Sequence, residues 1–284
     1  MKKTIIFLAV FFGSFSAFLV PYATAPSMVL VLYRMLLTLL LMLPMLWKHR
    51  REFLSIPRKT LLLNIGSGVA LGLHFTTYFE ALRTTSIASC AVLVDTEVLF
   101  VALISILFLR KKISPKAMAA ILVAFSGAVL VALTDTSSAS GALWGDMLAL
   151  LASIFMAIYT VLGAVCQKDV STTVYTYLVY AFAAMTVLIL SLANGLTLTG
   201  YGMENLWAAL GMAVFCTLLG HSLFSYCLNF LPATFISTVQ LMDCMYAALW
   251  GLLFYHQLPG MFILVGGALI VTGIAVYSRM TTEE

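Results

Sequence analysis

Two acidic residues lie deep inside long apolar stretches of the chain, where a carboxylate can bind a cation, carry a proton or form an ion pair. Glu97 is about eleven residues into the apolar run Ser86–Leu109, and Asp243 is equally deep in Ala233–Phe254. If both runs are helices, each acid is about 16 Å along its helix, near the centre of a hydrocarbon layer roughly 30 Å thick. A charge there costs from about 3 to over 10 kcal/mol, so each acid is expected to face an aqueous cavity, to be paired or to stay protonated.

The two acids occupy matching places in the two halves of the chain. Glu97 and Asp243 are 146 positions apart, and the pairs Leu82/Leu228 and Gly127/Gly273 have the same spacing. We therefore interpret the acids as part of a repeated architecture.

The composition is that of a polytopic membrane protein. The chain has 284 residues, of which 63% are hydrophobic and 9% charged, and its mean hydropathy is +1.08. A soluble domain of this size could not bury so much apolar surface. The five cysteines lack paired spacing, and we interpret them as small helix-packing residues without disulfide or metal roles.

Breaks between the apolar runs predict ten membrane-spanning helices. Six of the seven prolines lie at the ends of the runs or between them, where proline delimits helices without kinking them. The predicted spans are 4–21, 27–47, 60–82, 86–109, 116–134, 143–165, 173–193, 205–229, 233–254 and 260–279.

The distribution of basic residues predicts that both termini are cytoplasmic. With the N-terminus inside, 13 of the 15 Lys and Arg residues lie on the cytoplasmic side, and the exceptions are Arg34 and Arg83. This positive-inside pattern accounts for the net charge of +4 without a nucleic-acid partner. It predicts a multi-pass protein of the inner (cytoplasmic) membrane. An alternative is that Lys2–Lys3, the first apolar stretch and Ala23–Ala25 form a cleavable signal peptide, which would leave nine spans.

Five spans in each half predict two repeats of opposite orientation. Lys48–Arg51 is strongly basic, whereas the equivalent loop of the second half, Asn194–Glu204, has no basic residue. We predict an all-α fold with a first repeat at 1–134, an external linker at 135–142 and a second repeat at 143–284. Inverted repeats are a recurring plan of secondary transporters, with the substrate site near the midplane where the halves meet.

The predicted ninth helix presents an acid and two aromatic side chains on one face. Asp243, Tyr246 and Trp250 follow i, i+3, i+7 spacing. Together they could bind a cation through charge and ring quadrupole. The alternative is that the aromatic residues serve ordinary helix packing.

Near Glu97 the chain carries a second acid, Asp95, about 200° further around the helix, so both cannot point into one cavity. Arg34 lies too deep in the second predicted helix for comfortable snorkelling. It could form a salt bridge to Glu97 or Asp95, or bind a substrate carboxylate. Its repeat counterpart, Tyr180, could hydrogen-bond inside a cavity.

Two histidines occupy near-equivalent places, off by one in register: His74 in the third predicted helix and His221 in the eighth. Each is a candidate proton relay or substrate ligand, although a buried histidine more often bridges two helices by a hydrogen bond. Tyr78 shares a face with His74. The pattern Gly68–Gly72 is GxxxG, which in a membrane helix indicates close helix packing.

Several stretches resemble the EamA-type family of the drug/metabolite transporter superfamily. They are Gly145–Ala152 continuing to Ala157–Val161, Ala81–Ser89, and Leu231–Ala233. The resemblance covers essentially the whole chain, although Asp243–Cys244 and Glu97–Val98 lack the proline that many relatives have after the polar residue. It implies ten helices in two inverted halves, cytoplasmic termini and alternating-access transport of small metabolites, with export of amino acids or related compounds in many members.

We therefore predict a secondary transporter that exports amino acids or related small metabolites through a central site. Alternatives are import of a nucleoside-like or cofactor-like compound, an intramembrane enzyme using the acids, and a non-transport membrane protein. No catalytic or nucleotide-binding motif supports an enzyme, and neither a cofactor nor a metal is implied. The expected partners are a small-molecule substrate, the lipid bilayer and, as a coupling ion, protons, because burial disfavours a charged carboxylate. One chain is sufficient for a pathway, and a homodimer is compatible with the sequence.

Overall fold

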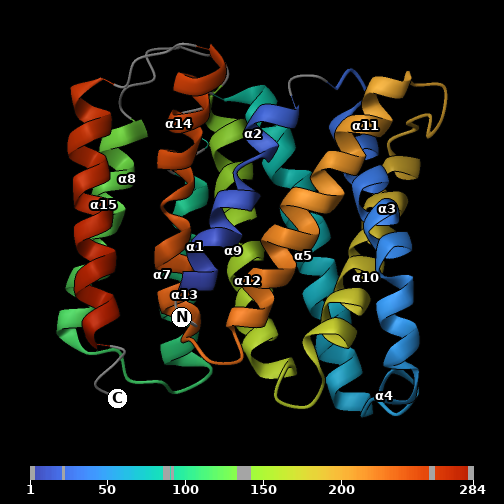
Figure 1. The fold of residues 1–284 in the computed structure, drawn as a ribbon, viewed down its shortest axis with the longest axis horizontal. Coiled ribbons are helices and arrows are strands. Elements are labelled where there is room, and N and C mark those ends of the chain that lie inside the picture. Colours follow the sequence, from blue (N-terminus) through green and yellow to red (C-terminus); the bar gives the residue numbers. More distant parts are fainter. Residues whose placement is uncertain are drawn as a thin grey trace.

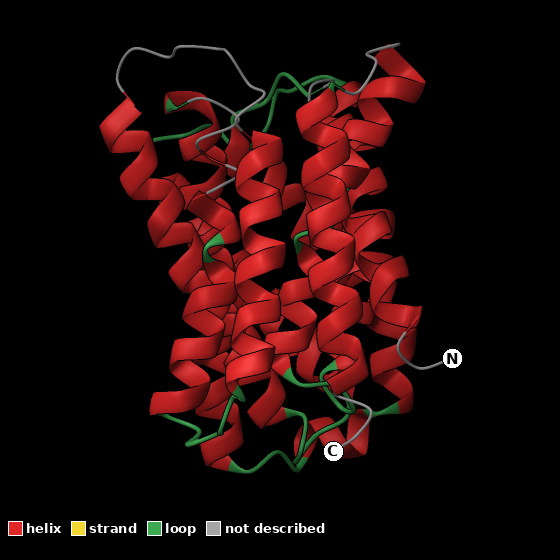
Figure 2. Ribbon diagram, turned by 90° about the vertical axis from the view of Figure 1, so that its left-hand side faces the viewer, coloured by secondary structure: helices red, strands yellow, loops and turns green. Residues whose placement is uncertain are grey.

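The protein is all-helical, as predicted. The computed structural model describes residues 4–20, 23–85, 90, 93–132, 142–255 and 260–280. Within these ranges it contains helices, turns and loops and no β-strand (Figure 2). Lys2–Lys3, residues 86–89 and 91–92 of the predicted fourth span, and residues 135–141 of the predicted linker lie outside the described residues, whereas residue 142 already belongs to a helix.

The helices of the first half overlap the predicted apolar runs, apart from a short helix in the basic loop after the second run, and α5 extends two residues beyond its predicted span at each end. They are α1 (Thr4–Gly13), α2 (Ser16–Leu19), α3 (Ser27–Lys48), α4 (Arg50–Leu54), α5 (Arg58–Thr84), α7 (Glu97–Leu107) and α8 (Pro115–Ala132).

The second half follows the same pattern and includes one wide π-helix, η2. Its elements are α9 (Ala142–Cys166), α10 (Thr172–Ala193), α11 (Met203–Gly211), η2 (Met212–His221), α12 (Ser222–Cys227), α13 (Ala233–Gln240), α14 (Asp243–Tyr255) and α15 (Met261–Met280).

Among the described residues, four helical stretches are long and apolar enough to cross a membrane. They are Ser27–Lys48, Leu143–Cys166, Thr172–Ala193 and Met203–Cys227. Their outward surfaces carry large exposed apolar side chains, such as Leu40 at 61% and Ile189 at 60% exposure, which suit contact with lipid.

Three of the predicted spans are interrupted where the sequence suggested continuous helices: the first, where Ser14 and Phe15 form a turn between α1 and α2, and the two that carry the acids. Residues 93–95 are helical, Thr96 forms a turn, and α7 then begins at Glu97. In the second half, Leu241 and Met242 separate α13 from α14, which begins at Asp243. Hydrogen bonds from residue i+3 to residue i tighten the chain at both points, with Leu99 N–H donating to Thr96 and Met245 N–H to Met242.

Helices α8 and α15 lie side by side at one edge of the bundle and pack through reciprocal glycines (Figure 1). A Cβ atom on Gly127 would lie 2.5 Å from the carbonyl oxygen of Gly266 and 2.9 Å from the nitrogen of Ile270. A Cβ atom on Gly273 would lie 2.6 Å from the carbonyl oxygen of Ala120 and 2.7 Å from the nitrogen of Ala124. Each residue of the second contact is 146 positions from its counterpart in the first.

The GxxxG pattern of α5 packs closely against α10, which confirms its predicted role. A Cβ atom on Gly68 would lie 2.5 Å from Cβ of Phe182, and one on Gly72 would lie 2.9 Å from Cβ of Thr186. Helix α10 also packs on α3, and α5 packs on α9. These contacts join helices of the first half to helices of the second.

Candidate functional site

Both midplane acids lie in the first turn of a helix that follows a break. Glu97 begins α7 and Asp243 begins α14. The first turn of a helix leaves backbone N–H groups without intrahelical partners and carries a partial positive charge, so it stabilises a carboxylate. The interrupted helices therefore supply a physical reason why acids are tolerated within these apolar stretches.

The side chain of Glu97 points toward α9. It is 3% exposed and accepts a hydrogen bond of 3.2 Å from the hydroxyl of Thr160. The preceding Thr96 donates its hydroxyl to the carbonyl of Leu93, and its oxygen lies 3.0 Å from that of Ser153 on α9. These contacts hold the break in the fourth span against a helix of the other half.

Asp95 connects the two other acids electrostatically. Its half-buried carboxylate interacts with the carboxylates of both Asp243 and Glu97. The ring of Tyr78 interacts with Asp95 and Asp243 as well. Glu97, Asp243 and Tyr78 therefore lie within electrostatic range of Asp95, and we refer to these four residues of α5, the fourth span and α14 as the acidic cluster.

Arg34 forms neither of the two salt bridges that the sequence suggested, to Glu97 or to Asp95. Its Nε donates a hydrogen bond of 2.7 Å to Oγ1 of Thr217 in η2, and its Cζ lies 4.6 Å from the ring centre of Phe75. In the described ranges no carboxylate lies within ion-pair distance of Arg34, so the pairing with Glu97 or Asp95 is not formed in this structure. The widened turn of η2 places Thr217 at Arg34, and sequence periodicity does not indicate such a turn.

His74 and His221 differ in their contacts although the sequence placed them as near-equivalents. His74 bridges helices, since its Nδ1 lies 2.9 Å from the carbonyl oxygen of Ala152 on α9 and its ring stacks on Tyr78 at 5.8 Å. His221 meets the ring of Phe75 edge to face at 5.4 Å, and its buried Nδ1 has no hydrogen-bond partner in the described part of the chain. His74 therefore fits the structural role, whereas His221 keeps a free ring nitrogen.

Tyr180 is fully buried and bonds to another helix. Its hydroxyl lies 3.0 Å from that of Ser222, and it interacts electrostatically with Arg34. Tyr159 forms a similar pair with Ser225, at 2.9 Å. Buried phenols of this kind are satisfied by neutral partners, here within the second half of the chain.

Tyr246 and Trp250 pack against α1 and the turn that follows it, as the alternative interpretation of the aromatic face expected. The ring centre of Tyr246 is 5.4 Å from that of Phe11, and that of Trp250 is 4.5 Å from that of Phe15. The indole Nε1–H of Trp250 also donates a hydrogen bond of 2.7 Å to the hydroxyl oxygen of Ser14. This geometry fixes α14 against α1.

The described residues contain no group of three or more His, Cys, Asp and Glu side chains that could hold a metal ion. Four of the five cysteines, Cys90, Cys166, Cys216 and Cys227, are buried thiols.

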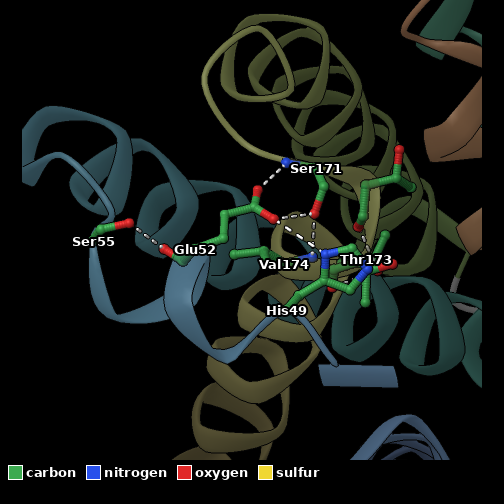
Figure 3. Close-up of polar contacts among 8 residues, drawn as sticks. His49, Glu52, Ser55, Ser171, Thr173 and Val174 are labelled. Atoms are coloured by element: carbon green, nitrogen blue, oxygen red, sulfur yellow. Dashed lines mark hydrogen bonds and ion pairs between the residues drawn. The ribbon is translucent and has the colours of Figure 1, made fainter. Parts of the chain in front are cut away.

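A separate polar cluster joins the halves at the end of the bundle that contains α4 (Figures 1 and 3). The carboxylate of Glu52 in α4 accepts hydrogen bonds from the backbone N–H and the hydroxyl of Ser171, the N-cap of α10. His49 lies 3.3 Å from the same carboxylate. Glu52 thus anchors the start of a second-half helix to a loop of the first half.

Three residues that contact Glu97, Arg34 or His221 were not singled out from the sequence as site residues. They are Phe75, Thr160 and Thr217. Phe75 could have been found, because it precedes His221 by the repeat interval of 146. Thr160 lies within a stretch that carries the family resemblance. Nothing in the sequence distinguishes Thr217, whose role depends on the π-helix.

Comparisons with known proteins agree with this architecture. The sequence model of the EamA-like transporter family matches twice, at residues 3–133 and 143–279. An uncharacterized transporter of Archaeoglobus fulgidus is 25% identical over 257 residues, covering 86% of this chain and 85% of that protein. The pseudopaline exporter CntI of Pseudomonas aeruginosa is 26% identical over 259 residues, covering 90% and 88%.

The fold also has a counterpart among solved structures. One crystal structure superposes with a TM-score of 0.80 at 16% identity, and the match covers 99% of this chain and 98% of that chain. With a family match that spans both halves and apolar helices of membrane-crossing length, the chain is a membrane protein and belongs to the EamA-like transporter family of the drug/metabolite transporter superfamily.

Proposed function

We propose that the chain exports small polar metabolites, amino acids or related compounds, by alternating access through a site between its two halves. The observation that carries this proposal is the matched pair of interrupted helices, with Glu97 and Asp243 each at the start of the second segment. Discontinuous helices near the midplane are the usual binding elements of transporters built from inverted repeats.

An inverted repeat of five plus five spans underlies the proposal, with the halves at 1–134 and 143–284 and an external linker at 135–142. The reciprocal contacts of Gly127 and Gly273 support it, because an approximate two-fold axis maps one contact onto the other. The two family matches, one in each half, support the same division.

Contacts at the two ends of the bundle also support the opposite orientation of the halves. At the end with α4, the hydroxyl of Thr60 donates a hydrogen bond of 2.7 Å to the carboxylate of Asp169. At the end where α11 starts, the side-chain oxygen of Asn205 accepts 2.8 Å from the N–H of Thr24 (Figure 1). The repeat interval of 146 relates Thr60 to position 206 and Asp169 to position 23, which are the neighbours of Asn205 and Thr24. A similar contact between the halves therefore recurs at the opposite end of the bundle.

The end with α4 is the cytoplasmic end in this proposal, which puts both termini inside the cell and the chain in the inner membrane. Helix α4 and the C-terminal end of α15 lie at the same end of the bundle (Figure 1). Lys48 at the end of α3, Arg50 in α4 and Arg279 in α15 are basic, as the positive-inside rule requires of a cytoplasmic face.

Export is favoured by the relative named as an exporter, at 26% identity. Proton coupling is part of the proposal, since Glu97, Asp243 and Asp95 could each carry a proton across the midplane. A single chain contains both halves of the pathway, so a monomer is sufficient.

The test compares metabolites released into the medium by cells that overproduce the wild type or the Glu97→Gln/Asp243→Asn variant. The proposal expects a polar compound to accumulate outside only with the wild type, while both proteins reach the membrane in equal amounts. Equal release from both, or release from neither, would contradict export through these acids. A fall in release on collapsing the proton gradient is expected as well, and unchanged release would remove the coupling.

A further inference from the structure

A basic pocket lies at the end of the bundle that contains α4, where the last residues of α3 meet the first residues of α4. Its volume is about 540 Å³, within the range of roughly 300–1,000 Å³ that is typical of ligand sites. No residue of the proposed transport site lines it. The residues that line this α3–α4 pocket are Trp47, Lys48, His49, Arg50, Arg51 and Glu52.

The α3–α4 pocket holds positive charge that the protein leaves unpaired. Lys48, Arg50 and Arg51 are exposed, and among the described residues no carboxylate lies within ion-pair distance of any of them. The acid of the lining, Glu52, is turned toward α10 and accepts hydrogen bonds from Ser171 (Figure 3). The pocket is therefore suited to an anion from outside the chain.

Contacts within the protein hold the α3–α4 pocket in shape. Helix α4 is fixed to α10 by the hydrogen bonds of Glu52 and by the ring of Phe53, which meets that of Tyr177 edge to face at 6.2 Å. On the other side of the pocket, the guanidinium carbon of Arg50 lies 5.1 Å from the ring centre of Trp47. A pocket that is already formed binds its ligand at a smaller entropic cost.

An apolar stripe of α3 leads into the pocket. Its residues recur at the spacing of one helix face and are all exposed: Leu36, Leu40, Leu43 and, at 70%, Trp47. Helix α3 has 22 residues and is therefore about 33 Å long, enough to cross a hydrocarbon layer roughly 30 Å thick. Its last residues thus lie at the level of the lipid headgroups, where tryptophan is enriched.

We propose that the α3–α4 pocket binds the anionic headgroup of a membrane phospholipid, whose acyl chain lies along the stripe of α3. Arg50 and Arg51 contact the phosphate, because the fork of guanidinium donors fits phosphate oxygens. Basic pockets at this level of membrane helices recognise anionic headgroups. A zwitterionic headgroup fits less well, because its ammonium group would face three unpaired cations. The inference is independent of the proposed export.

The experiment measures lipid binding to the purified, delipidated full chain in detergent by native mass spectrometry. The probes are phosphatidylglycerol and phosphatidylcholine with the same acyl chains, and glycerol phosphate as a soluble headgroup. The variant Arg50→Gln/Arg51→Gln removes both guanidinium groups. Lys111→Gln/Lys112→Gln is the matched control, because it removes two exposed positive charges before α8, which begins at the same end of the bundle and at its opposite edge (Figure 1).

The inference expects the wild type to bind phosphatidylglycerol at least about tenfold more tightly than phosphatidylcholine. The arginine variant should bind the two lipids alike. The lysine variant should keep the wild-type affinity to within about threefold, because at about 0.15 M salt charges beyond roughly 8 Å are largely screened. The comparison of the two lipids on the wild type needs no variant and tests the headgroup preference by itself.

Three results would overturn the inference. Equal affinity of the wild type for the two lipids would remove the headgroup preference. Equal losses in the arginine and lysine variants would assign the binding to the general surface charge of this end of the bundle. Displacement of phosphatidylglycerol by an equal concentration of glycerol phosphate would assign the pocket to a soluble anion.

Discussion

The rings of Phe75 and His221 meet edge to face with their centroids 5.4 Å apart, and the two residues are separated by the repeat interval of 146. Arg34 and Tyr180 have the same separation and interact electrostatically. In the proposed two-fold arrangement, residues that contact their own repeat counterparts lie close to the axis that relates the two halves. The proposal therefore places the guanidinium of Arg34 near that axis.

Removal of the acceptor of Arg34 is expected to destabilise the protein. Thr217→Val keeps the shape of the side chain and leaves Nε of Arg34 without a partner, at a cost of roughly 1–3 kcal/mol. Thermal and denaturant unfolding in detergent would measure this loss. Thr76→Val is the control, because the Thr76 hydroxyl bonds only within its own helix, to the carbonyl of Gly72. Equal losses in both variants would contradict a special role for the contact between Arg34 and Thr217.

The reciprocal glycines predict matched effects in the two halves. Gly127→Ala and Gly273→Ala each place a methyl group against backbone atoms of the facing helix and should each destabilise by about 1–3 kcal/mol. Gly13→Ala is the control, since a Cβ atom there has nothing within 4 Å. A large loss in one of the two variants and none in the other would be incompatible with a two-fold arrangement of α8 and α15.

The polar cluster at the start of α10 predicts a modest loss of stability. Ser171→Ala removes the N-cap and one hydrogen bond to Glu52, with an expected cost of about 1 kcal/mol. Ser55→Ala should stay within about 0.5 kcal/mol of the wild type, because its exposed hydroxyl bonds only to a neighbouring carbonyl. The melting temperatures of the two variants would test this, and a loss in Ser55→Ala as large as in Ser171→Ala would argue against the anchor.

Asp95→Asn should reduce transport although the sequence alone left its orientation open. Its carboxylate interacts with both other acids, so its loss changes the charge of the whole cluster. Loss of a charge-assisted hydrogen bond to substrate, about 1.5–3 kcal/mol, corresponds to a rate decrease of roughly tenfold or more. Glu204→Gln, an exposed acid outside the cluster, serves as the control. Full activity of Asp95→Asn would exclude it from the site.

Hydropathy was sufficient to predict an all-helical membrane protein, and stretches such as Gly145–Ala152 and Ala81–Ser89 carried the family resemblance. Hydropathy could not reveal the breaks at Thr96 and Met242, because neither position carries the proline or glycine that commonly marks the end of a helix. The close packing of α5 through its GxxxG pattern was predictable, because glycines at that spacing let another helix approach the backbone closely.

The partners of the buried polar groups were not predictable from the sequence. A salt bridge for Arg34 was a reasonable expectation from charge alone. The structure instead shows a hydrogen bond from Arg34 to Thr217, which lies in a π-helix that has no sequence signature. Likewise, Trp250 shares a helical face with Asp243, but tertiary contacts with Phe15 and Ser14 decide its role.

The most direct test of transport through the midplane acids is counterflow in proteoliposomes, loaded with the compound that wild-type cells release. Wild-type protein should exchange external labelled compound for internal unlabelled compound. The Glu97→Gln/Asp243→Asn variant, reconstituted in equal amount, should exchange it at least about tenfold more slowly, as expected for the loss of charged contacts to the substrate. Equal initial rates for the two proteins would contradict a transport site at the two interrupted helices.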